Sequence, residues 1–164
     1  MSIKGTRAFD LYDAVVTTLQ GTSGFSGPTG DGIVVFDGPV VTDDEPRHYV
    51  TIGSTVLAGD DTEESAFTIQ SQWQALPVSI NGRQEAITLR CGITRWSGDG
   101  TWSNLRADVE STLDMIAAAL INVQAVGLSG MVGIVLSNFD LIQFPNPNGN
   151  AVTLSFDIEA SFLL

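Results

Sequence analysis

The chain has 164 residues, enough for one domain with a single core, and 43% of them are hydrophobic whereas only 16% are charged. Its 19 acidic residues outnumber its 7 basic ones, and the formal net charge of −12 repels phosphate, which argues against a nucleic-acid binder that works by counterion release. No apolar run reaches the roughly 18 residues of a membrane span, and the N-terminus lacks the apolar core of a signal peptide. We therefore expect one domain over residues 1–164, assembled in the cytoplasm and not bound to a membrane.

The first third of the chain predicts one helix and two short strands. Apolar residues recur every three or four positions over residues 8–19, as in an amphipathic helix, with Thr6 suited to cap its start and Gly21 to end it. Residues 21–32 contain five glycines and predict a loop. Short buried strands are expected at residues 33–36 and 49–53.

Two half-buried strands follow, at residues 66–73 and 87–93, because apolar and polar side chains alternate in both segments. The Asn81-Gly82 dipeptide between them favours a tight turn with positive φ, so the two strands are expected to form a hairpin. Pro77 limits how far the first strand can pair.

A long second helix is predicted to begin near Ser103 or Asn104, since either residue can cap it. Its far half, residues 115–121, is apolar on almost every side. Such a helix is buried on more than one side, either beneath its own sheet or against a neighbouring subunit. The apolar stripe along the helix consists of Leu105, Val109, Leu113, Ile116, Leu120 and Val123.

The C-terminal third predicts a long antiparallel hairpin. Apolar and polar side chains alternate from Val152 almost to the last residue, and residues 131–144 are also strand-like. Residues 145–150, which contain two prolines, are expected to form the tip. The fold class predicted from these elements is α+β, with a mixed, mostly antiparallel sheet packed against two main helices and a long C-terminal β-hairpin.

The sequence predicts no catalytic site. His48 is the only histidine and lies in a charged segment, and Cys91 is the only cysteine and lies in an apolar strand pattern where burial is expected. No serine lies in a Gly-X-Ser-X-Gly turn. Asp157 and Glu159 are expected on the solvent face of the last strand, where charges normally lie. We therefore expect that the protein is not an enzyme.

The sequence also predicts no metal or cofactor site. The acidic loop formed by Asp60, Asp61, Glu63 and Glu64 lacks the alternating carboxylates, the glycine turn and the distal glutamate of a calcium-binding loop. The glycine-rich segment 21–32 lacks the lysine of a phosphate-binding loop. The acidic loop is accordingly expected to be solvated.

Four residues are candidates for contact with another subunit or a partner. Trp96 and Trp102 flank a turn, and tryptophan is enriched at the energetic centres of interfaces. Met115 and Ala119 lie on the far half of the second helix. The alternative for the two tryptophans is packing at the edge of the domain's own core.

The order of elements carries a resemblance to a known family. The features are a helix over residues 9–19, the segment Val35-Phe-Asp-Gly-Pro39, a strand at 49–53 before an acidic loop, a strand at 87–93 running into Trp96-Ser-Gly-Asp99, a long helix from Asn104 and a closing amphipathic strand. This layout resembles the tail terminator, or tail completion, proteins of long-tailed phages and related prophages.

The resemblance implies a structural role in the virion. Proteins of that family form a ring, usually a hexamer, that caps the last ring of the tail tube, stops its growth and presents a surface to the head connector. The implied partners are therefore further copies of this chain, the tail tube protein and the head–tail connector protein. DNA would pass through the ring without specific binding, and the acidic loop Asp60, Asp61, Glu63 and Glu64 is a candidate for the lumen. The implied location is the virion tail, assembled in the host cytoplasm.

Three alternatives stay open at the level of the sequence. A tail-tube or head–tail connector subunit would share the α+β layout. A small-molecule or peptide-binding module is an alternative from another class of protein. An enzyme that uses carboxylates alone is the least favoured of the three.

Overall fold

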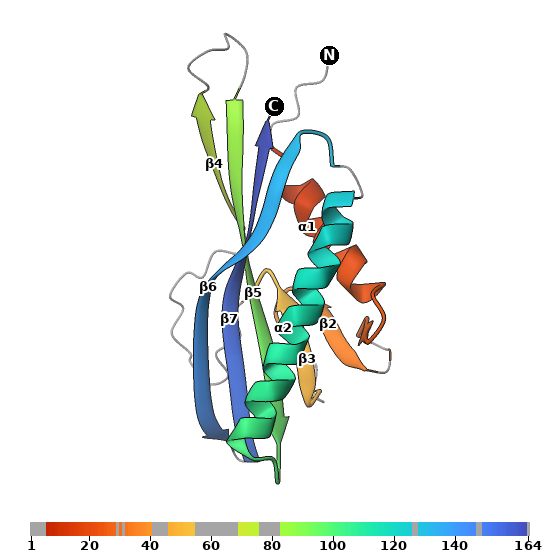
Figure 1. Cartoon of the computed structure of the whole chain (residues 1–164), viewed down its shortest axis with the longest axis vertical. Coiled ribbons are helices and arrows are strands. Elements are labelled where there is room, and N and C mark those ends of the chain that lie inside the picture. The colour runs from red at the N-terminus through yellow and green to blue at the C-terminus, as the bar shows by residue number, and fades with distance from the viewer. Residues whose placement is uncertain are drawn as a thin grey trace.

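The computed structural model describes residues 6–28, 30, 32–40, 46–54, 69–75, 83–125, 128–146 and 149–163, which form two helices and a mixed seven-stranded sheet (Figure 1). Parallel pairing joins β1 to β2 and β2 to β3, and every other described pairing is antiparallel. This confirms the predicted α+β class. The elements in chain order are α1 (Ala8–Gln20), β1 (Phe25–Ser26), β2 (Ile33–Asp37), β3 (His48–Ile52), β4 (Ile69–Ala75), β5 (Arg83–Ser97), α2 (Trp102–Ala125), β6 (Met131–Asn146) and β7 (Gly149–Leu163).

The sheet is built around the long strand β5. Along one side β5 pairs with β7 over most of its length, and β7 in turn pairs with β6, which forms the edge. Along the other side β4 pairs with the first half of β5 and β3 pairs with the second half. In Figure 1, β4 and the start of β5 extend beyond the ends of the two helices. The predicted antiparallel pairing of β4 with β5 and the C-terminal hairpin of β6 and β7 are confirmed, whereas the turn predicted at Asn81-Gly82 lies outside the described residues.

The main hydrophobic core lies between the helices and one face of the sheet. Alternate residues of β5 and β7, such as Ile87, Leu89, Phe156 and Ile158, point toward the helices and are buried. The helix α2 contacts β5, β7 and β6, and α1 packs beside α2. A second, smaller cluster consists of Val34, Phe36 and Tyr49, with Val40 packed against it. The first three alternate along β2 and β3 with residues that belong to the main core.

Part of the glycine-rich segment is a strand, whereas the sequence predicted a loop. Phe25 pairs with Ile33 across β1 and β2, and the backbone NH of Ile33 donates to the carbonyl of Gly24 over 3.1 Å. Gly24 and Gly32 have φ values of 91° and 103°, which other residues rarely adopt. Two glycines at these positions help the chain to loop round within nine residues, so that β2 runs parallel to β1 and Phe25 is buried.

The helix α2 begins at Trp102, slightly before the predicted start. The side-chain oxygen of Thr101 accepts a hydrogen bond from the backbone NH of Asn104 over 3.3 Å. Thr101 therefore supplies the cap that was assigned to Ser103 or Asn104.

The tip of the C-terminal hairpin is shorter than predicted, because β6 and β7 remain paired as far as Asn146 and Gly149. Pro145 is tolerated because β6 is an edge strand, where one side of the backbone needs no ladder hydrogen bonds. Gly149 has a φ of 135°, and a Cβ atom there would lie 2.1 Å from the carbonyl oxygen of Ser97. Only glycine lets the hairpin approach the end of β5 this closely.

The start of α1 is held by a carboxylate from the sheet. Glu85 of β5 is fully buried, and it accepts hydrogen bonds from the backbone NH of Arg7 at 2.8 Å, from the hydroxyl of Ser71 at 2.5 Å and from the hydroxyl of Thr6. The Thr6 hydroxyl in turn accepts from the NH of Ala8 at 3.0 Å, although the N-cap position of α1 is occupied by Arg7 and not by Thr6 as predicted. A negative charge is favourable at this end of a helix because the helix dipole is positive there.

Candidate assembly surface

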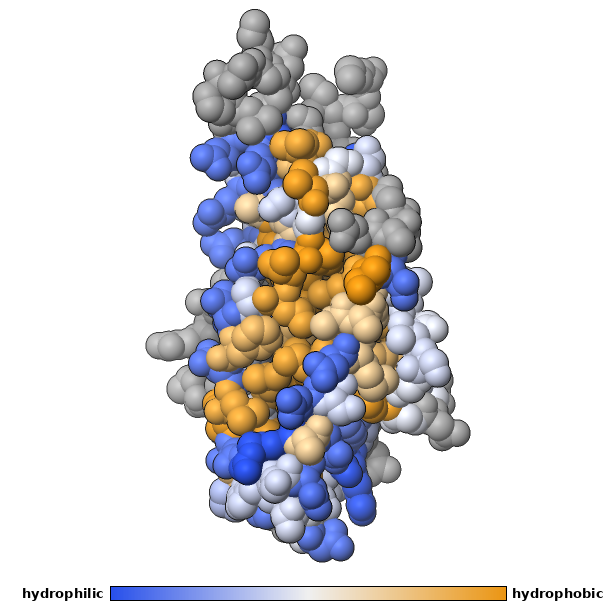
Figure 2. All heavy atoms as spheres, viewed as in Figure 1, coloured by the Kyte–Doolittle hydropathy of each residue, from blue (hydrophilic) through white to orange (hydrophobic). Residues whose placement is uncertain are grey.

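Exposed apolar side chains are concentrated on α2 and β6. Figure 2 shows an extended apolar area on the face that carries these two elements. Of the nine large hydrophobic side chains that are exposed in the described part of the chain, six belong to α2 and β6, and we call the exposed apolar side chains of these two elements the α2–β6 surface. They are Ile121 (69% exposed), Val132 (57%), Val135 (57%), Phe139 (52%), Leu141 (48%) and Ile142 (40%). Val135 and Ile142 pair with Glu159 and Thr153 of β7, so these two lie on the sheet face away from α2.

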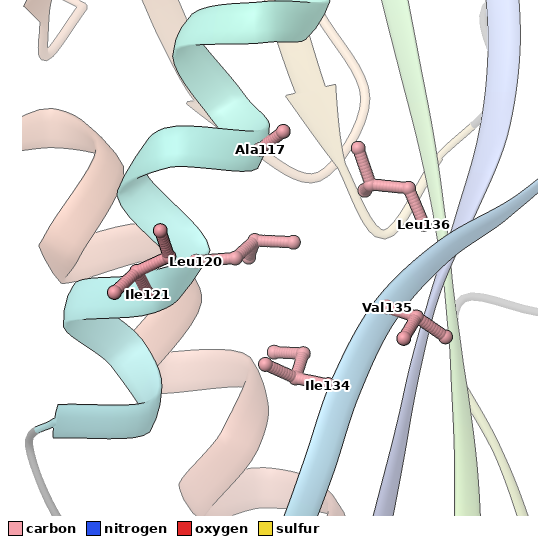
Figure 3. Close-up of a pocket in the computed structure, with 6 residues that line it drawn as sticks. All are labelled: Ala117, Leu120, Ile121, Ile134, Val135 and Leu136. Carbon is pink, nitrogen blue, oxygen red and sulfur yellow. The ribbon is translucent and has the colours of Figure 1, made fainter.

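An open groove of about 260 Å³ lies between α2 and β6 (Figure 3). Its side chains are all aliphatic, and Ala117 and Leu120 project from α2 toward the strand. Binding sites for small polar ligands need a few convergent polar groups that fix the ligand's orientation, and this lining supplies no polar side chain. The groove suits an apolar side chain of another protein. The lining residues are Ala117, Leu120, Ile121, Ile134, Val135 and Leu136.

The outer edge of β6 has no partner strand within the described part of the chain. β6 is 16 residues long, so this edge is a long row of backbone groups available to another chain. Natural edge strands are commonly protected by charged side chains and prolines. The sequence of β6 contains one charged residue, Asp140, and one proline, Pro145, near its end. The rest of the strand is a suitable site for strand addition by another chain.

Two irregularities in β6 coincide with exposed apolar side chains. The pairing with β7 shifts register between Met131 and Gly133 and again between Ser137 and Asp140. Each shift places two residues of β6 opposite one residue of β7, which is a β-bulge. Val132 lies in the first bulge and Phe139 in the second.

The second bulge is held by a buried polar network. Asn138 has a φ of 53°, and its side-chain amide donates to Asp157 over 2.9 Å. Asp157 also forms an ion pair with Arg90 at 3.3 Å. Asp157 is only 2% exposed, so the prediction that it lies on a solvent face with Glu159 was wrong for this residue. Its carboxylate serves to fix the bulge, and Glu159 is half-buried on the same strand.

The structure places the four predicted interface residues largely within the subunit. Trp96 donates from its indole nitrogen to the carbonyl of Pro46 over 3.0 Å and is half-buried. Trp102 and Met115 are half-buried and pack against the main core. Ala119 is 2% exposed and belongs to that core, so its predicted exposure on the back of the helix was wrong. The reason is that Ala119 shares the helix face of Ile116, whereas Ile121 points away from the core.

The most exposed tryptophan of the three is Trp73, which the sequence did not single out as an interface residue. Its side chain is 38% exposed on β4, and the guanidinium of Arg83 lies 3.7 Å from the ring centroid. An aromatic ring with a stacked arginine is a common element of protein interfaces. In the sequence, the only indication of this residue was a tryptophan within a strand of alternating apolar and polar side chains.

The acidic loop of Asp60, Asp61, Glu63 and Glu64 lies outside the described residues. Its assignment to the lumen of a ring therefore stays a prediction.

Cys91 and His48 are the two residues that were considered for nucleophilic chemistry, and their environments in the structure differ. Cys91 is fully buried in β5, and burial raises the pKa of its thiol. The Nε2 atom of His48 lies 2.7 Å from the hydroxyl of Thr112, which itself donates to the carbonyl of Asp108 over 2.8 Å. The hydroxyl therefore accepts a hydrogen bond from the Nε2–H group of the imidazole, which makes His48 a structural link between β3 and α2.

The environment of His48 predicts a pH dependence of stability. Burial, and then the positive charge of Arg95, lower the pKa of His48 from 6.5 to about 4. Because the folded state binds this proton less readily than the unfolded state, the contribution is fully present above pH 6.5 and is lost as the pH falls toward 4. The loss should be about 2 kcal/mol, less than full linkage gives because the ring is partly solvated.

The measurement is urea unfolding of the wild type and of His48→Gln between neutral and acidic pH. The difference between the two proteins isolates the histidine from the many carboxylates that titrate in the same range. A difference that stays constant across this range would contradict the prediction.

Within the described ranges, no group of three or more His, Cys, Asp or Glu side chains is arranged to hold a metal ion. No helix in that part of the chain is long and apolar enough to cross a membrane. Neither a family model nor a curated protein matches the sequence.

Proposed function

We propose that this chain is a structural virion protein, the ring-forming subunit of a phage tail terminator. The observation that carries the proposal is the α2–β6 surface, an uncharged aliphatic groove beside a long edge strand with exposed apolar side chains. Contiguous apolar surface of this kind on a soluble domain marks a protein interface. The resemblance of the element order to tail terminators supports the identity of the assembly.

The shape of the sheet supports a ring rather than a simple pair. A ring requires a head-to-tail contact, in which two different surfaces of each subunit meet. The described strand order runs from β1 to β6, with β4 as a branch on β5, so the apolar edge at β6 differs from β4, a polar strand with exposed Gln70, Gln72 and Gln74. Each copy can therefore present one end to the preceding copy and the other end to the next.

The charge of the chain supports the passage of DNA through such a ring. At −12, the protein repels phosphate, so DNA would slide through the opening without adhering to its wall. In this proposal the two faces of the ring contact the tail tube protein and the head–tail connector protein.

The purified protein should form a closed ring with a mass about six times the 17.4 kDa of the chain. Light scattering would give the mass, and negative-stain electron microscopy would give the shape. Open tubes would favour a tail-tube subunit, and a stable monomer would contradict self-assembly and favour a binding module.

A second experiment mixes the ring with growing tail tubes. The ring should bind at the tube end and stop elongation, and continued elongation would contradict the terminator role.

A further inference from the structure

β6 has the residue pattern of a central strand, although it lies at the edge of the sheet. Strands covered on both faces read as near-continuous apolar runs, whereas a strand with one solvated face alternates between apolar and polar residues. In β6, Ile134, Val135 and Leu136 are apolar at successive positions. Ile134 and Leu136 point toward α2, and Val135 lies on the other side of the strand (Figure 3). Val135 remains 57% exposed, so the subunit leaves this face of the strand open.

The outer edge of β6 also lacks the usual protection against a further strand. The two bulges lie at either end of the stretch 133–137, and within this stretch β6 pairs regularly with β7. Residues 133–137 include no charged residue and no proline, which are the side chains that commonly protect natural edges. No strand pairs with their outward-facing backbone groups in the described part of the chain. The stretch is about as long as an average strand, so it can pair with one more.

The aliphatic groove lies beside the same stretch. It has a volume of about 260 Å³ and is lined by residues 134–136 of the strand and by Ala117, Leu120 and Ile121 of the helix. A strand added along residues 133–137 would place every second side chain on the α2 side of the sheet, next to this groove. In strand addition, main-chain hydrogen bonds supply affinity and pockets for alternate side chains supply specificity. The groove is such a pocket, and its lining selects an apolar side chain.

The charges beside this stretch are negative on both faces of the sheet. On the face away from α2, Val135 is paired with Glu159 of β7, which is half-buried, and Asp140 is exposed just beyond the second bulge. On the other face, Asp114 is exposed on α2. The overall charge of −12 acts in the same direction. Lysine or arginine in an added strand therefore matches the charge of the site, and the aliphatic part of such a side chain can cover Val135.

We propose that residues 133–137 of β6 bind an extended segment of a different protein, as an added strand in which apolar side chains alternate with lysine or arginine. The apolar side chains face α2 and fill the groove, and the cations lie on the other face beside Glu159 and Asp140. This inference goes beyond the proposed ring and does not depend on it, because a single subunit offers the same edge and groove. In the ring, the segment lies where the β6 end meets the next copy, and its cations offset part of the repulsion between two acidic chains.

The test uses the full-length protein and short fluorescent peptides, with binding measured by fluorescence anisotropy. A peptide in which valine alternates with lysine should bind, and its binding should weaken as salt is added, because salt screens exposed charges. The same peptide with N-methylated backbone amides cannot donate to β6 and should bind at least about tenfold more weakly. A third peptide, with glutamate in place of lysine, should not bind measurably. Equal binding of either control peptide overturns the inference.

Two protein variants separate this site from a general attraction of a cationic peptide to an acidic protein. Val135→Lys places a cation beside the lysines of the bound peptide and should weaken its binding about tenfold. Ala86→Lys is the matched control, because Ala86 is exposed on the same face of the sheet but on β5, with β7 between it and β6. This control should bind the peptide as the wild type does. Equal weakening in both variants overturns the inference, as does unchanged binding by Val135→Lys.

Hydrogen exchange locates the bound peptide. Amides within residues 133–137 should gain protection when the valine–lysine peptide binds. Protection gained instead on β4, which pairs only with β5 in the described part of the chain, overturns the inference. If the peptide binds only after dilution has dissociated assembled protein, a second copy occupies the edge and the inference is likewise overturned. A protein that stays monomeric and binds the peptide contradicts the proposed ring and supports the added strand, which separates the two failures.

Discussion

Replacing Ile121 with aspartate should dissolve the assembled ring into monomers and leave the fold intact. Ile121 is 69% exposed near the end of α2 and lines the groove, so the change leaves the core of the subunit untouched. Within the contact, the variant loses about 2 kcal/mol of apolar burial and adds a carboxylate that must give up its hydration. We expect the dissociation constant of each contact to rise at least about 100-fold, which corresponds to roughly 3 kcal/mol.

The control for this variant is Asn122→Asp. Asn122 is the next residue of α2, is exposed and does not line the groove, so the variant adds the same charge beside the surface and not within it. Sedimentation velocity should show monomers for Ile121→Asp and the wild-type assembly for Asn122→Asp. Far-UV circular dichroism should be the same for all three proteins. If both variants dissociate, then added negative charge and not the loss of Ile121 is responsible.

The main elements of the fold could be predicted from periodicity because the core lies on one side of the sheet. Residues of β7 alternate between the core and the opposite face, so the pattern from Val152 onward fixed both the strand and its buried face. The first helix was equally clear, since Ala8, Val15 and Leu19 lie on one face and are buried. The predicted bounds of the elements were wrong at β1, where glycines permit backbone conformations that other residues rarely adopt, and at Pro145, where an edge strand tolerates proline.

The assembly surface could not be located from the sequence for a different reason. Residues 115–121 are apolar almost all round, so the sequence showed that the helix has two apolar sides and not which side faces the sheet. The tertiary packing buries Ile116 and Ala119 and leaves Ile121 exposed. In β6, the two bulges displace Val132 and Phe139 from simple alternation, so neither could be assigned to a face in advance. The carboxylate of Asp157 was misplaced because its partners, Arg90 and Asn138, come from two other strands.

Removing the buried carboxylate of Glu85 should cause the largest loss of stability. Glu85→Ala leaves the NH of Arg7 and the hydroxyls of Thr6 and Ser71 without their shared acceptor, a carboxylate that is fully buried. Hydrogen bonds to a charged group contribute more than neutral ones, so we expect the loss of all three to cost about 3 kcal/mol. For a domain of this size the loss corresponds to a decrease in Tm of about 10 °C.

The experiment is best made in the Ile121→Asp background, because assembly would otherwise add its own concentration-dependent stability. Ser71→Ala removes one of the three donors and should lose only about 1 kcal/mol of stability, while Glu110→Ala, on the exposed side of α2, should be close to neutral.

Hydrogen exchange adds a local measurement. The amide of Arg7, which donates to Glu85 over 2.8 Å, should lose its protection in Glu85→Ala. The amides of β7 should keep their protection under conditions that favour the folded state. If Glu85→Ala is no less stable than Glu110→Ala, then the carboxylate does not hold α1 to the sheet, and the apolar contacts of Leu11 and Val15 alone must do so.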